Sequence, residues 1–217
     1  MMEGSECHMD VVARHLGLEG LYSPRFSRND PVSTMWQKGR RKEDQLVHYM
    51  FETDWELTAP IEQVFEVLSH PEDFERWWPS VTKSSLVAEG DSQGVGNHAR
   101  YTIRSPLLYT MTFDVKTIEV QRPNRIRAVV RGDLIGTGTY HLESAGSNTS
   151  VRFNWYVSTT KRWMNLAASF AKSLFAWAHD RVMLEGCEAM ARHLGARLVS
   201  AGTSMVHAPT PVPVTQR

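Results

Sequence analysis

The chain has 217 residues, and its 24 lysine and arginine residues balance 24 aspartate and glutamate residues, so the formal net charge is zero. This balance does not provide the basic field that nucleic-acid binding favours. The two cysteines, Cys7 and Cys187, lie far apart and do not indicate a disulfide framework or a metal cluster. Because no apolar run has secretory or membrane-spanning length, we expect a soluble, cytoplasmic protein without integral membrane association.

Residues 1–46 are poor in apolar periodicity and are predicted to form a flexible leader. The charged run Lys38–Asp44 is typical of a solvated linker, although it could also contact a phosphate-bearing partner. Met35 or Met50 could be the true start, in which case the leader is not part of the native protein.

A strongly alternating segment, Val47–Leu57, follows the leader. Its odd-numbered positions from 49 to 57 share one face and include three aromatic residues, whereas its even-numbered positions from 52 to 56 are acidic, which is typical of a half-buried antiparallel strand. Pro60 then favours the start of a helix, and Pro71–Trp78 favours a second short helix that Pro79 ends.

Strand and turn signals continue from residue 81 to residue 159. Six further strands are predicted, with spacing short enough for hairpins in a meander: Val81–Ala88, Asn97–Arg104, Leu107–Val120, Arg125–Asp133, Gly136–Ser144 and Thr149–Thr159. Together with the first strand they predict a seven-stranded antiparallel sheet.

A long helix is predicted for Trp163–Leu194, which contains no proline and a single glycine. The wide apolar arc, including Leu166, Leu174 and Trp177, predicts a helix that the sheet grips over most of its girth. Residues 196–217, with three prolines, are predicted to be a disordered tail, so the domain is expected to span residues 47–195. The fold class expected is α+β, with a curved sheet around this terminal helix.

This order of elements resembles the helix-grip fold of the START-related, birch-pollen-allergen-like and polyketide cyclase/dehydrase proteins, grouped as SRPBCC. The resemblance covers roughly residues 47–195, and the chain looks like the bacterial branch labelled polyketide cyclase/dehydrase and lipid transport. Its local carriers are Thr58–Phe65, His70–Pro79, Gly132–Gly136 and Trp177–Met183. The superfamily includes carriers, sensors, cyclases and hydrolases, so the resemblance implies a fold rather than one activity.

The inward faces of the predicted strands are aromatic and aliphatic, and every carboxylate on the strands falls on the outward face. The pattern therefore predicts neither an inward pair of carboxylates for acid–base catalysis nor an inward metal cluster, and no cofactor. It is typical of the lining of a pocket for a mostly apolar molecule, although the same side chains could simply fill a core.

The residues expected to line such a pocket lie on the strands, at the end of the second short helix and on the long helix. They are Thr53, Trp55, Trp78, Tyr101, Tyr109, Met111, Phe113, Tyr140, Trp155, Phe170, Leu174 and Ala178. His179 is the one candidate for catalysis, as a general base or as a donor to a ligand carbonyl. The alternative is a core or surface histidine whose ring forms a hydrogen bond with a backbone group. Trp78 could be a gate or part of the core.

Three functions remain open from the sequence. The first is binding of a hydrophobic small molecule, such as a lipid, a quinone or a polyketide-like compound. The second is a cyclase- or dehydratase-type enzyme that folds a polyketide-like substrate, with His179 and a tyrosine directing proton transfer. The third is a protein-interaction module with a filled core. The sequence identifies neither the ligand nor the oligomeric state.

Overall fold

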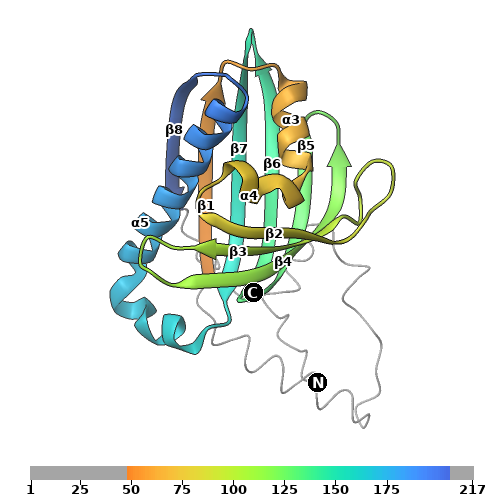
Figure 1. The fold of residues 1–217 in the computed structure, drawn as a ribbon. Coiled ribbons are helices and arrows are strands. Elements are labelled where there is room, and N and C mark those ends of the chain that lie inside the picture. Colours follow the sequence, from red (N-terminus) through yellow and green to blue (C-terminus); the bar gives the residue numbers. More distant parts are fainter. Residues whose placement is uncertain (1–47, 206–217) are drawn as a thin grey trace, which may run out of the picture. The chain divides into compact units, whose positions relative to one another are not determined.

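The computed structural model describes residues 48–205, without the side chains of residues 167–172. All strands in this part of the chain belong to one antiparallel sheet. Its strand order is β2-β3-β4-β5-β6-β7-β1-β8 (Figure 1). The strands are β1 (His48–Leu57), β2 (Val81–Ala88), β3 (His98–Arg104), β4 (Thr110–Gln121), β5 (Arg125–Gly132), β6 (Leu134–Ala145), β7 (Asn148–Thr159) and β8 (Leu198–Met205). The predicted meander from the second to the seventh strand is therefore confirmed.

The alternation of β1 has the expected consequence for burial. Tyr49, Phe51 and Trp55 are buried, whereas the intervening Glu52 and Asp54 are partly exposed. Arg152 of the paired strand β7 lies opposite Asp54, and its Nε donates to that carboxylate at 2.8 Å. The acidic side chains of the strand thus lie on the outer face, where they form exposed ion pairs rather than entering the core.

Two short helical segments connect β1 to β2. Helix α3 (Ile61–Ser69) begins directly after Pro60 and buries Ile61, Val64, Phe65 and Leu68. The 3-10 turn η1 (Pro71–Asp73) leads into α4 (Phe74–Trp77), which the backbone N–H of Trp78 closes by donating to the carbonyl of Phe74. Both short helices were predicted, and they place Phe74 and Trp78 in the core.

The long helix α5 (Arg162–His193) is confirmed, but the expectation that the sheet grips most of its girth is wrong. Trp163, Leu166, Leu174 and Trp177 are all 46% or more exposed. Figure 1 shows that α5 bends in its first half, and the ring centroids of Trp163 and Phe175 lie only 6.2 Å apart. Twelve residues of a straight helix would span about 18 Å.

The sheet has eight strands rather than seven, because β8 pairs with β1 along the edge opposite to β7. The prediction of a disordered tail from residue 196 is therefore wrong for residues 198–205; residues 1–47 and 206–217 lie outside the described residues. Gly195, with a φ of 62°, allows the chain to leave α5 and return along β1. Once paired, the backbone donors and acceptors of β1 are satisfied on both sides.

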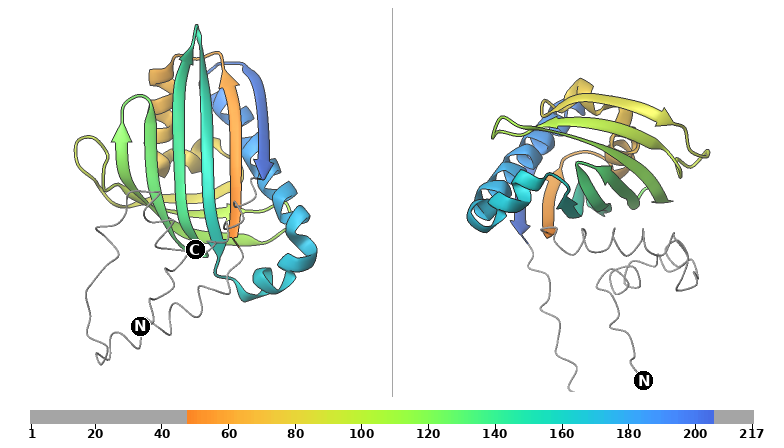
Figure 2. Two further views of the ribbon diagram at one scale, coloured as in Figure 1. Left: turned by 180° about the vertical axis from the view of Figure 1, so that it is seen from behind. Right: turned by 90° about the horizontal axis from the view of Figure 1, so that it is seen from below.

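The strands β2, β3 and β4 cross over β6 and β7, so that the sheet curves, and α5 runs along its open side (Figure 2). The buried side chains between them form one hydrophobic core, contributed by the sheet, by α3 and α4, and by α5 from Met164 to Ala191. No helix among the residues that the structure describes combines the length and the apolar character needed to cross a bilayer.

Candidate functional site

A cavity of about 170 Å³ lies between the sheet and α5. Its lining is almost entirely apolar and rich in aromatic rings. The sheet, the segment around α4 and the helix α5 all contribute, and the lining residues are Tyr49, Phe51, Phe74, Trp78, Val81, Tyr101, Ile103, Ser105, Tyr109, Met111, Phe113, Val115, Leu134, Tyr140, Phe153, Trp155, Val157, Thr159, Met164, Phe175, Ala178, His179, Val182 and Met183. None of them carries a permanent charge.

Most of the residues predicted to line a pocket do line this cavity. They are Trp78, Tyr101, Tyr109, Met111, Phe113, Tyr140, Trp155 and Ala178, and the candidate His179 joins them. The predicted side chain of Phe170 lies outside the described side chains. The alternation of the strands predicted these residues because successive side chains of a strand point to opposite faces, and one face of the sheet lies toward α5.

Three predicted residues lie elsewhere. Thr53 is buried, but its Oγ1 forms a hydrogen bond of 3.1 Å with Oγ1 of Thr203 on β8, the strand that the sequence did not indicate. Trp55 borders a separate space of about 10 Å³, which has room for about one water molecule. Leu174 is 46% exposed because the cavity face of α5 follows Phe175, Ala178, His179, Val182 and Met183, one residue further round the helix.

Sequence reasoning missed several lining residues, above all Tyr49, Phe74 and Phe175. Tyr49 and Phe51 share the inward face of β1, so alternation alone indicates both. Phe175 belongs to a second apolar stripe of α5, shared with Val182, and this stripe faces the sheet. The pattern of the second short helix predicts that Phe74 points inward, but its place in the cavity wall depends on how α4 packs on the sheet.

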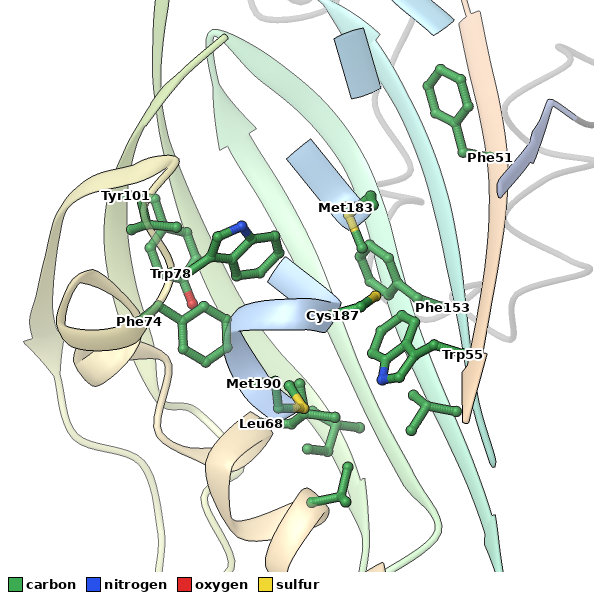
Figure 3. Close-up of a cluster of buried hydrophobic side chains, with 14 of the residues drawn as sticks. Phe51, Trp55, Leu68, Phe74, Trp78, Tyr101, Phe153, Met183, Cys187 and Met190 are labelled. Atoms are coloured by element: carbon green, nitrogen blue, oxygen red, sulfur yellow. The ribbon is translucent and has the colours of Figure 1, made fainter. Parts of the chain in front are cut away.

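Trp78 is a fixed part of the wall rather than a gate. Its indole is 7% exposed, and Nε1 donates to the carbonyl oxygen of Val182 at 3.2 Å. The ring lies directly on Gly186, where an added Cβ would come within 2.4 Å of the indole. Figure 3 shows Trp78 and Phe74 on one side of the core, with Met183 of α5 and Phe153 of the sheet on the other.

His179 lies on α5 with its ring stacked on Phe51 of β1, at a centroid distance of 3.9 Å and an interplanar angle of 8°. Most of the imidazole is enclosed by protein although the residue keeps some accessible surface, and burial lowers its pKa to about 3. The imidazole is therefore uncharged at neutral pH. Such a weak base is poorly matched to proton abstraction at pH 7, so the geometry supports a hydrogen-bonding group more than a general base.

The tyrosines supply the other polar atoms of the wall. Burial raises the pKa of Tyr140, with a smaller effect from Cys187, and burial likewise raises the pKa of Tyr101 well above its usual value. Burial also raises the pKa of Tyr109, which a hydrogen bond with Ser105 partly offsets. All three phenols therefore stay protonated and can donate hydrogen bonds. Within the described residues, no three histidine, cysteine or carboxylate side chains gather as metal ligands would.

Solved structures of several bacterial proteins share this fold. The Zhui aromatase/cyclase from Streptomyces sp. R1128 has a TM-score of 0.57 at 13% identity and covers 69% of this chain and 94% of its own. The protein TTHA0849 from Thermus thermophilus has a TM-score of 0.54 at 18% identity, with 67% and 93% covered. A conserved protein from Geobacillus kaustophilus has a TM-score of 0.54 at 11% identity, with 69% and 98% covered. Similarity at this level of identity shows the fold alone.

Among curated proteins, no sequence matches this chain. The family described as "Polyketide cyclase / dehydrase and lipid transport" matches residues 50–195, which include β1 without its first two residues, all of α5 and every strand between them. This match spans most of the chain and all of the cavity wall except Tyr49. The chain belongs to the polyketide cyclase / dehydrase and lipid transport family.

Proposed function

We propose that the domain binds an uncharged, hydrophobic small molecule in the cavity between the sheet and α5, with a lipid, a quinone or a polyketide-like compound as the classes to test. The observation that carries this proposal is the apolar space of about 170 Å³ in an otherwise packed core. A cavity of roughly 150 Å³ in another protein holds benzene, so this one has room for one substituted ring. A longer ligand would extend out of the cavity toward solvent.

The lining favours a neutral ligand. No lysine, arginine, aspartate or glutamate is among the lining residues, so an ionised ligand would lose its hydration without gaining a partner of opposite charge. Eleven of the lining side chains are Phe, Tyr or Trp, and their flat faces suit a planar ring that packs against them.

Binding is preferred here over the two alternatives. A cyclase- or dehydratase-type enzyme needs a group that accepts a proton, and His179, with a pKa lowered to about 3, is a weak one. A protein-interaction module would be expected to fill its core, whereas this core contains a cavity. Family membership supports a hydrophobic ligand without identifying it, and the cytoplasmic location and the absence of a nucleic-acid partner stay predictions from composition.

The test is titration of the purified full-length protein with ethylbenzene, followed by tryptophan fluorescence, together with native mass spectrometry of the gently purified protein. Ala178 is 2% exposed and lines the cavity, so Ala178→Trp should fill the space and abolish binding. Leu174→Trp is the matched control, because it adds the same side chain on the exposed face of the same helix. A wild-type protein that neither retains nor takes up any apolar molecule would contradict the proposal.

A further inference from the structure

The two ring nitrogens of His179 have different surroundings. Nδ1 is buried and has no hydrogen-bond partner. Nε2 also makes no hydrogen bond, yet it keeps accessible surface, since it is not among the buried unpartnered atoms of the described residues. Because Phe51 covers one face of the ring and the residue lines the cavity, this accessible surface faces the cavity.

These surroundings decide where the single proton of the neutral ring lies. A buried N–H without an acceptor is rarer and costlier than a buried acceptor that lacks a donor. The proton therefore belongs on Nε2, and the ring presents an N–H donor to the cavity. Stacking on Phe51, at 3.9 Å and 8°, fixes the plane in which this donor points.

Two tyrosine hydroxyls add donors of the same kind. The hydroxyls of Tyr101 and Tyr140 make no hydrogen bond and are absent from the buried unpartnered atoms, so they too keep accessible surface in the wall. Tyr140 packs edge-on against Trp55 of β1. Trp55 lies four residues along the strand from Phe51, the partner of His179, so Phe51 and Trp55 are about 13 Å apart. The donors thus lie at two separated places around an apolar centre.

Building on the proposed function, we infer that the ligand is an uncharged ring compound bearing a carbonyl oxygen, which accepts a hydrogen bond from Nε2–H of His179. A second acceptor oxygen on the far side of the ring would meet the hydroxyl of Tyr140 or Tyr101. Among the three classes above, this chemistry fits a quinone or another cyclic ketone and does not fit a simple acyl chain.

The test compares three single-ring probes: acetophenone, ethylbenzene, which has the same skeleton without the oxygen, and benzoate, which is charged. The full chain should bind acetophenone about five-fold more tightly than ethylbenzene, the gain of one buried hydrogen bond. Benzoate should bind at least ten-fold more weakly than acetophenone, on the order expected for burying an unpaired charge. The carbonyl stretching frequency of bound acetophenone should fall below its value in hexane.

The variant His179→Phe keeps the stacking on Phe51 and should bind acetophenone and ethylbenzene equally. His141→Asn is the control: it removes a histidine on the outer face of the sheet, outside the cavity wall, so the preference for acetophenone should persist. If no probe binds, the proposed function itself fails. If ethylbenzene and acetophenone bind equally to the wild type, or if the carbonyl frequency is unshifted, the proposed function stands and this inference is overturned.

Discussion

Replacing His179 with phenylalanine should remove a pH dependence of stability that the wild-type protein shows in mild acid. Burial lowers the pKa of this imidazole in the folded state to about 3, from an ordinary value of 6.5. Between these two values the unfolded chain binds a proton that the folded protein does not. Stability is therefore complete above pH 6.5 and falls as the pH decreases toward 3.

The magnitude follows from the width of this window. Inside this window, each pH unit lowers the free energy of unfolding by about 1.36 kcal/mol. Only the part of the interval from pH 7 to pH 5 that lies below the ordinary pKa of 6.5 counts in full. His179 should therefore lower the free energy of unfolding by about 2 kcal/mol between pH 7 and pH 5. The value is insensitive to the exact folded pKa, because pH 5 is still well above it. Asp114, whose pKa the Arg100 hydrogen bond lowers from an ordinary value of 3.8, titrates below the interval from pH 7 to pH 5.

The assay is urea unfolding of the wild type and the variant at pH 7 and at pH 5. The wild type should lose about 2 kcal/mol more than His179→Phe does. His141→Asn is the control, since His141 is a half-buried residue of the outer sheet face whose pKa is lowered by burial and by Arg125 and Arg152. That variant should retain most of the loss. Equal losses in the wild type and in His179→Phe would refute the argument that this imidazole is buried in uncharged form.

Two further predictions concern packing contacts. Gly186→Ala should destabilise the domain by about 1–2 kcal/mol in urea unfolding, because the new Cβ would lie 2.4 Å from the indole of Trp78. The control Gly202→Ala places its Cβ in open space and should be neutral, so equal effects of the two variants would contradict the role of the Trp78 contact. Deleting residues 198–217 should remove β8 and lower the melting temperature by about 6–12 °C, the scale of a loss of ~3 kcal/mol in the free energy of unfolding. Deleting residues 206–217 alone should leave the melting temperature unchanged. A small shift in the longer deletion would mean that pairing of β8 with β1 contributes little to stability.

The sequence predicted most of the sheet because burial imposes a period of two on each strand that has one wet face. In β1, Phe51 and Trp55 are buried and Glu52 and Asp54 are not, as their alternation predicted. The segment Leu198–Met205 carried no such signal. It is an edge strand whose residues 200–204 are small or polar and mostly exposed. Its partner β1 lies about 150 residues earlier in the chain, as the hydrogen bond between Thr53 and Thr203 illustrates.

The candidate site was harder to predict than the sheet, and α5 shows why. Two apolar stripes run along this helix, one through Leu174 and Trp177 and the other through Phe175 and Val182. Hydrophobicity alone ranks them equally, but only the second faces the sheet, since Leu174 and Trp177 are nearly half exposed. Which stripe turns inward depends on how α5 packs against the sheet, and the local sequence does not encode that packing.

The persistence of the cavity is itself an argument for a ligand. At about 24 cal/mol per Å³, an empty space of 170 Å³ costs on the order of 4 kcal/mol, a large fraction of the stability of a typical domain. The wall resists collapse because its rings hold one another: Phe153 stacks on Tyr140 at 4.2 Å and lies 5.3 Å from Trp155, which in turn covers Gly138. A ligand that enters meets a surface already in place, so little of its binding energy is spent on ordering side chains. A chain with no use for this space could fill it with a larger residue at Ala178, and the retained cavity therefore favours binding as the role of the domain.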